Sequence, residues 1–171
     1  DDFSTLFEPS RFDTVVALDV LEHLASPEDA ARRIATLLKP GGRVLASTAN
    51  IAFFLMRLLL LLGVFNYGKR GILDNTHRRL FTVGSFVRLF RTYGFEVTAV
   101  RGFGPPIRDL ISKRFPFSVI DLVLSTLARL APRLFSYNFL VVARRLPSLE
   151  EVYAATVSRE AGLAPTAERI P

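Results

Sequence analysis

The sequence predicts an α/β fold in which helices pack on a mainly parallel sheet. Three observations support this prediction. Residues 12–20, FDTVVALDV, form a short apolar run with β-branched side chains, which is typical of a buried strand. Residues 26–29, SPED, carry the signals of a helix start, and residues 43–48, RVLAST, form a second strand after the turn KPGG. A strand, a helix and a strand in this order predict parallel pairing through a right-handed crossover.

The helix between these strands has a clear start and one apolar face. Ser26 is the expected N-cap, Pro27 occupies the first helical position, and Asp29 stands three residues after the cap. We expect this helix to end before KPGG. Four apolar residues recur at helical spacing and form its core face: Ala30, Ile34, Leu37 and Leu38.

The remaining elements follow from periodicity and from turn residues. Thr82 or Ser85 caps the helix that Gly94 stops, with Phe86, Leu89, Phe90 and Tyr93 at core spacing. The other expected elements are a helix over 51–63, a polar loop over 66–79, a strand over 95–103, a helix over 116–133 and a last strand over 138–145. We therefore predict a domain over residues 1–146 and a polar tail with a short helix over residues 147–171.

The composition narrows the classes of function. The net charge is +6 over 171 residues, but the charges are scattered and no run of five like charges occurs, so we expect no nucleic-acid partner. The chain has no cysteine, which excludes disulfides and thiolate metal sites and favours a reducing compartment. We expect a cytoplasmic protein that can associate with a membrane.

Three motifs together resemble a known family. FDTVVALDVLEHL, LLKPGGRVLASTAN and GILDNTHRRLFTVGSFVRLFRTYGF follow the order and spacing of class I S-adenosylmethionine (SAM)-dependent methyltransferases. The subset they resemble is the ubiquinone-biosynthesis-like O-methyltransferases, including those fused to glycosyltransferase domains. The resemblance covers about residues 11–146. It implies a Rossmann-like sheet of which this chain holds strands four to seven, the last antiparallel, together with a helical insertion.

The resemblance also implies a cofactor and a class of substrate. SAM would lie beyond the carboxyl ends of the strands, near Ala17, Leu18 and Asp19. The acceptor would be a small molecule, such as a sugar, a phenol, a quinone or a natural-product scaffold. The family's glycine-rich first loop and its ribose-binding acidic residue are not in this sequence, and we expect both upstream of Asp1. Ala49 stands where the family usually has proline.

Two histidines fall inside these motifs and are candidate site residues. His77 lies in the polar loop and is our candidate general base, because a neutral imidazole can accept the proton of an acceptor hydroxyl. Asp19, Glu22 and His23 share one face if a helical turn begins there. Related enzymes hold a divalent metal with a similar acidic-histidine cluster and a downstream histidine, which implies Asp19, Glu22, His23 and His77 as ligands. The alternative is that both histidines only order the local backbone.

Further candidate regions have two interpretations each. Arg78 and Arg79 could hold an anionic group of the substrate or could simply face solvent. The apolar segments 51–65 and 116–135 could pack against the sheet, or could cover a lipophilic substrate or rest on a membrane. Segment 51–65 is shorter than the ~20 residues of a spanning helix and contains Arg57.

A non-catalytic module of the same fold that docks on a membrane or a partner protein is the alternative to an enzyme. A nicotinamide-dependent dehydrogenase is a weaker one.

Overall fold

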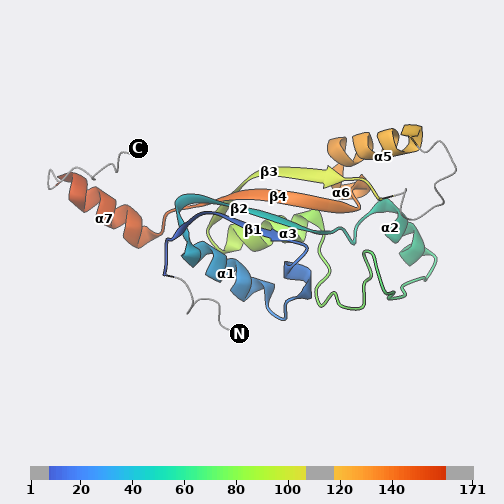
Figure 1. Cartoon of the computed structure of the whole chain (residues 1–171), viewed down its shortest axis with the longest axis horizontal. Helices are drawn as coiled ribbons and strands as arrows, with labels where there is room; N and C mark the ends of the chain where they lie inside the picture. The colour runs from blue at the N-terminus through green and yellow to red at the C-terminus, as the bar shows by residue number, and fades with distance from the viewer. Residues whose placement is uncertain (1–7, 107–117, 161–171) are drawn as a thin grey trace.

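The computed structural model describes residues 8–106 and 118–160 and contains a mixed four-stranded sheet (Figure 1). The strands are β1 (Phe12–Leu18), β2 (Leu38–Ala49), β3 (Phe95–Phe103) and β4 (Asn138–Arg145), in the order β1-β2-β4-β3. β1 and β2 are parallel, and β4 runs antiparallel to both β2 and β3. The predicted α/β class and the antiparallel last strand are therefore confirmed.

The described helices agree with most of the predicted elements. They are η2 (Leu21–His23, a 3₁₀ turn), α1 (Pro27–Leu37), α2 (Phe54–Leu61), α3 (Val83–Thr92), α5 (Ser118–Leu130), α6 (Pro132–Phe135) and α7 (Leu149–Glu160). Ser26 Oγ accepts the Asp29 N–H at 3.2 Å, which confirms the predicted cap of α1. Thr82 caps α3, and its side chain and that of Ser85 form a reciprocal capping box.

Aromatic side chains dominate the core between the sheet and the helices α1 and α3. Phe86 contacts Phe81, Phe90 and Phe139 in edge-to-face geometry, with ring centroids between 4.9 and 5.5 Å apart. Phe90 contacts Phe95 in the same way. All five rings are buried. A buried Phe contributes about 1.5–3 kcal/mol, and each edge-to-face pair adds about 0.5–1.5 kcal/mol, so this cluster is a main source of stability.

Two predicted boundaries were wrong. The helix expected over 116–133 is divided: α5 ends at Leu130, Ala131 has non-helical angles (φ −134, ψ 67), and α6 begins at Pro132. Proline has no N–H for a helix interior and disfavours helical angles in the preceding residue, so the break follows from Pro132. The second strand begins at Leu38 rather than residue 43, since Leu38 pairs with Phe12 instead of continuing the helix. Residues 116 and 117 lie outside the described ranges.

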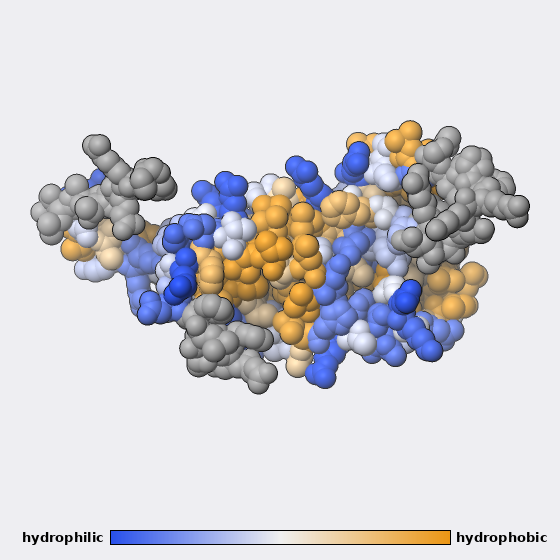
Figure 2. All heavy atoms as spheres, viewed as in Figure 1, coloured by the Kyte–Doolittle hydropathy of each residue, from blue (hydrophilic) through white to orange (hydrophobic). Residues whose placement is uncertain are grey.

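The second face of the sheet is left open by the described helices. Val15 and Ala17 pack against the core, so the alternate residues of β1 point to the other side. There Val16 and Leu18 keep 59% and 54% of their surface exposed. Figure 2 shows apolar residues gathered over the middle of the molecule, where Figure 1 places the sheet. Apolar surface of this kind is typical of a face that another layer covers.

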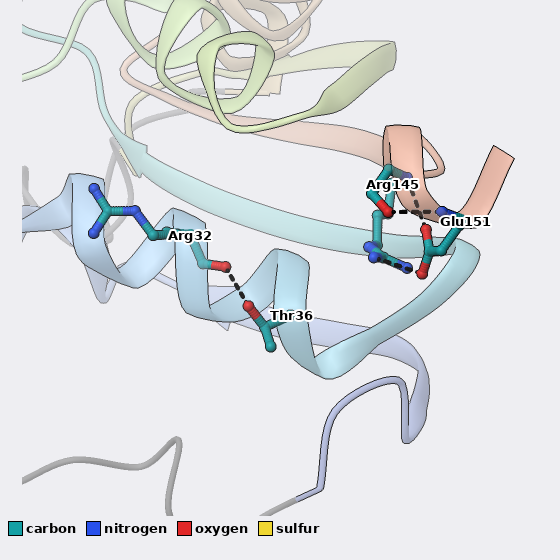
Figure 3. A network of polar contacts seen from close by, with 5 residues as sticks. Arg32, Thr36, Arg145 and Glu151 are labelled. Atoms are coloured by element: carbon teal, nitrogen blue, oxygen red, sulfur yellow. Dashed lines mark hydrogen bonds and ion pairs between the residues drawn. The ribbon is translucent and has the colours of Figure 1, made fainter. Parts of the chain in front are cut away.

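Helix α7 projects from one end of the molecule and is held at its base by a polar cluster (Figures 1 and 3). Arg145 Nη2 donates to Glu151 Oε1 at 2.9 Å, and the Ser148 N–H donates to Glu151 Oε2 at 2.7 Å. The Glu151 N–H donates in return to Ser148 Oγ at 3.2 Å, which completes a capping box. The Ser148 N–H and then Arg145 lower the pKa of the Glu151 carboxyl. Figure 3 also shows Thr36 Oγ1 donating to the Arg32 carbonyl one turn back in α1.

We predict that Glu151→Gln loosens α7 while leaving the sheet intact. The substitution removes the charge partner of Arg145, whose side chain is only 12% exposed, so docking of α7 should weaken by about 1 kcal/mol at pH 7. Because the folded pKa of Glu151 is lowered, its contribution is complete above the ordinary value of 4.5 and is lost as the pH falls through the folded value. Hydrogen exchange of α7 amides at pH 7 should be faster in the variant. Equal exchange in the variant and the parent would contradict this prediction.

Candidate functional site

The chain leaves β1 through a left-handed residue at the carboxyl end of the sheet. Asp19 has φ 51, which non-glycine residues rarely adopt and which Asp and Asn tolerate better than most. Ser47 Oγ donates to Asp19 Oδ1 at 2.9 Å, and Asn138 Nδ2 donates to the same oxygen at 2.9 Å. The Asp19 N–H bonds to the carbonyl of Ser47 at 3.1 Å. One carboxylate thus joins β1 to β2 and to the first residue of β4.

The turn at Asp19 places Glu22, three residues later, in the interior. Glu22 is 2% exposed, and its Oε2 has no hydrogen-bond partner among the described residues. Burial raises the pKa of the Glu22 carboxyl above its ordinary value of 4.5. The Glu22 carbonyl accepts the N–H groups of Arg78 and Arg79 at 2.8 and 3.0 Å. The polar loop predicted over 66–79 is therefore fixed to η2 by its backbone.

The same loop is anchored on its other side by α2. Ile72 is buried with Phe53 and Met56 in a small second apolar cluster. Asp74 Oδ1 accepts the N–H and the hydroxyl of Thr76 at 2.8 and 2.7 Å, and these bonds lower the pKa of Asp74. The loop is thus an ordered turn.

The two histidines meet at this site. Their ring centroids lie 4.8 Å apart in an edge-to-face arrangement. His77 Nδ1 lies 2.9 Å from the Ile72 carbonyl oxygen, and His23 Nδ1 lies 3.2 Å from the Thr76 carbonyl oxygen. A carbonyl oxygen can only accept, so we assign the proton of each neutral ring to Nδ1. Nε2 of each ring then carries a lone pair.

Glu22, His23 and His77 form a group that could hold a metal ion. One candidate ligand atom of each residue lies within 4.8 Å of those of the other two. Glu22 is buried, His77 is half-buried and His23 is exposed, so the group lies at the surface with its acidic member inward. Asp19 is not in the group. The predicted shared face of Asp19, Glu22 and His23 was wrong, because the left-handed angle at Asp19 precedes the turn and its carboxylate bonds to Ser47 and Asn138.

The other predicted site residues are distributed around this group. Leu18 is exposed at the end of β1, whereas the Ala17 side chain packs against the core. Arg79 forms an ion pair with Glu28 of α1 at 3.0 Å, and the side chain of Arg78 is exposed. A cavity of about 600 Å³ between α3, β3 and α6 is lined by none of the predicted site residues.

Sequence reasoning missed the residues that hold the site together. Ser47 and Asn138 are 28 and 119 positions from Asp19, and no local pattern links them to it. Asn50 is fully buried and donates to the Ser136 carbonyl at 3.0 Å, while its Oδ1 accepts the Ala52 N–H. The sequence STAN, which ends β2 and continues to Asn50, was the only signal for Ser47 and Asn50.

We predict that Asp19→Ala destabilises the chain more than Asp19→Asn. Alanine loses both side-chain bonds and tolerates φ 51 poorly, so the free energy of unfolding should fall by about 1–2 kcal/mol. Asparagine keeps an acceptor oxygen and tolerates the left-handed region, so its cost should be below about 1 kcal/mol. Urea denaturation of both variants measures the difference. Equal losses would mean that the backbone angle is not the constraint.

Comparison with known proteins places this fold. Residues 1–100, more than half of the chain, match the family model described as a methyltransferase domain. A ubiquinone biosynthesis O-methyltransferase from Ralstonia nicotianae is 34% identical over 97 residues, which cover 56% of this chain and 40% of the relative. The chain thus spans well under half the length of that relative.

Solved structures agree on the fold. A SAM-dependent methyltransferase from Archaeoglobus fulgidus superposes with a TM-score of 0.53 at 14% identity, covering 84% of this chain and 63% of the other. The 1,6-didemethyltoxoflavin-N1-methyltransferase of Burkholderia thailandensis, whose structure includes S-adenosylhomocysteine, superposes with a TM-score of 0.51 at 18% identity, covering 86% and 49%. The sheet order, the helices and the matched family model lead to one conclusion: the chain belongs to the methyltransferase domain family.

Proposed function

We propose that this chain is the C-terminal part of a SAM-dependent methyltransferase domain that methylates an oxygen atom of a small-molecule acceptor. The name of the Ralstonia relative supports an oxygen acceptor, and the bound S-adenosylhomocysteine of the Burkholderia structure supports the cofactor. The acceptor class that we propose is a sugar or quinone-like hydroxyl compound. The observation that carries the proposal is the pair of imidazoles beside a buried carboxyl at the carboxyl end of the parallel strands.

The residues at the end of β1 suit contact with SAM, which supplies the methyl group. Leu18 and Val20 are 54% and 44% exposed there and offer apolar surface to the nucleoside or the methionine portion. Asp19, between them, keeps its backbone fixed through Ser47. Ala17 can contribute only backbone groups, since its side chain packs against the core. The open sheet face fits a domain whose remaining layer comes from the part that the longer relatives have.

His77 is the proposed general base. Its Nδ1 proton is directed to the Ile72 carbonyl, so Nε2 can accept the proton of an acceptor hydroxyl. The buried carboxyl of Glu22 lies close enough to stabilise the imidazolium that results. Arg78 is exposed beside His77 and can bind an anionic group of the acceptor, whereas Arg79 is held by Glu28.

The first test is binding of the cofactor product and turnover by the full-length protein. We expect S-adenosylhomocysteine to bind in isothermal titration, and His77→Ala to lower kcat by about 10²–10⁴-fold with cofactor affinity unchanged. Arg32→Ala is the control, because Arg32 is exposed on α1, where it pairs with Asp29 and lies over the ring of Tyr93, and neither residue belongs to the histidine group. Absence of binding heat at saturating concentration would contradict the cofactor assignment and favour the non-catalytic alternative. Unchanged kcat in His77→Ala would contradict the general-base role.

A divalent metal ion is a second candidate for the same group. The residues fit: two imidazoles whose Nδ1 atoms face carbonyl oxygens, and a buried oxygen of Glu22 that has no hydrogen-bond partner within the described ranges. Glu22, His23 and His77 would hold the ion, which would favour the ionised form of an acceptor hydroxyl. Asp19, expected as a fourth ligand, lies outside the group.

The metal assignment has its own prediction. Titration of Zn²⁺ or Co²⁺ into chelator-treated protein should give one site, and His23→Ala and His77→Ala should each weaken binding at least about tenfold. Asp19→Asn is the matched control and should leave the affinity unchanged. If both histidine variants bind the metal as the parent does, or if EDTA leaves activity unchanged, His77 acts without a metal.

A further inference from the structure

The cavity of about 600 Å³ between α3, β3 and α6 lies at one edge of the sheet, because β3 is the last strand in the strand order. Residues 97–100 of β3 form one wall, and α6 contributes Pro132 and Arg133. We call this space the arginine cavity. Its volume is in the range of small-molecule sites. Four residues of α3 line it at helical spacing, as one stripe of that helix: Gly84, Val87, Arg88 and Arg91.

The wall of the arginine cavity toward the protein interior is apolar. The hydroxyl of Thr98 does not contribute polarity, because it donates to the Val142 carbonyl at 3.1 Å within the sheet. A ligand that fills the cavity therefore needs an apolar body. Four valines of this wall belong to the main core or pack against it: Val83, Val87, Val97 and Val100.

The charge of the arginine cavity has one sign. Arg88, Arg91 and Arg133 are exposed, and none of them forms an ion pair within residues 8–106 and 118–160. Glu96, next to the β3 wall, is already paired with Arg144 at 2.8 Å. An excess of unpaired positive charge around an apolar surface favours an anionic ligand. Three long segments that include the lining residues contain no Asp or Glu: 75–95, 97–108 and 122–149.

The positions of the three arginines suit one anionic group. Arg88 and Arg91 are three residues apart on the same face of α3, so their Cβ atoms are about 5–6 Å apart. Like charges at this spacing repel each other, and a bound anion would relieve that repulsion. Each guanidinium presents a planar fork of N–H donors that matches the oxygens of a phosphate. Arg133 reaches the cavity from α6, so donors come from two different elements.

The arginine cavity differs from the apolar segments that the sequence analysis named. Leu61 of α2 and Leu122 of α5 are exposed, but no described helix is both long enough and apolar enough to cross a bilayer. Exposed leucines alone do not define what would cover them. The cavity combines a bounded volume, an apolar wall and charge of one sign, and these properties together specify the chemistry of a ligand.

We propose that the arginine cavity binds an amphipathic organic phosphate, that is, a phosphate monoester of an apolar or aromatic alcohol. Arg88, Arg91 and Arg133 bind the phosphate oxygens, and the apolar body lies on the valine wall. None of the residues proposed for methyl transfer or for the metal lines the cavity. The proposal is therefore independent of the proposed methyltransferase function.

The test is isothermal titration of the full-length protein with 1-naphthyl phosphate, and separately with its two fragments, 1-naphthol and inorganic phosphate. We expect 1-naphthyl phosphate to bind at one site and at least about tenfold more tightly than either fragment, because the site uses both the charge and the apolar body.

Two kinds of variant locate the site. Arg88→Gln and Arg133→Gln should each weaken binding of 1-naphthyl phosphate at least about fivefold. Gly84→Trp should weaken it at least about tenfold by filling the cavity, and the backbone tolerates it, since the nearest atom to an added Cβ is Thr82 Oγ1 at 3.8 Å. Arg11→Gln is the matched control, because Arg11 is exposed, removes the same charge and does not line the cavity. Circular dichroism melting confirms that the variants fold.

Four outcomes would overturn the proposal. The parent protein could give no binding heat with 1-naphthyl phosphate. 1-Naphthol could bind as tightly as the ester, which would exclude recognition of the anion. Arg11→Gln could weaken binding as much as Arg88→Gln, which would reduce the effect to net charge. Binding could be lost in His77→Ala and retained in Gly84→Trp, which would place the ligand at the histidine group. Titration with S-adenosylhomocysteine bears only on the methyltransferase proposal, so the two proposals fail separately.

Discussion

The left-handed turn at Asp19 is the constraint on which the rest of the site depends. A strand that ends in this conformation turns its next residues sharply, and here the turn is held by Ser47 of β2 and Asn138 of β4. Strain of this kind persists only where the surroundings determine it more strongly than the local backbone preference. Because three strands share one carboxylate, the position of the following 3₁₀ turn is fixed relative to the whole sheet. The positions of Glu22 and of the loop bonded to its carbonyl are therefore fixed as well.

The burial of Glu22 is costly for stability. Burial removes the carboxyl from water, one of its oxygens has no partner in the described part of the chain, and the raised pKa reflects the cost of burial. An apolar residue at this position would be more favourable for folding alone. A costly buried carboxyl next to two imidazoles is the kind of trade between stability and function that the proposed site would require. The aromatic cluster of Phe86 and its neighbours supplies the stability that permits it.

Helix α2 has two different sides. Its buried side, with Met56, anchors the loop whose backbone orients His77. Its other side exposes Leu58 and Leu61.

The sequence by itself determined the class of the fold and most of its elements, because caps, breakers and periodicity act over a few residues. Ser26, Thr82 and Gly94 bound their helices as local rules predict, and the alternation of residues 95–103 predicted β3. Pro132 is a local signal as well. We predicted that it ends one helix, whereas it begins α6. Only the tertiary structure decided which groups meet. The bond between Asn138 and Asp19 spans 119 positions, and the orientation of the two imidazoles depends on carbonyl contacts that no pattern encodes. The sequence also left open whether the leucines of α2 are exposed, because the same apolar run occurs in helices that pack on a sheet, contact lipid or face water.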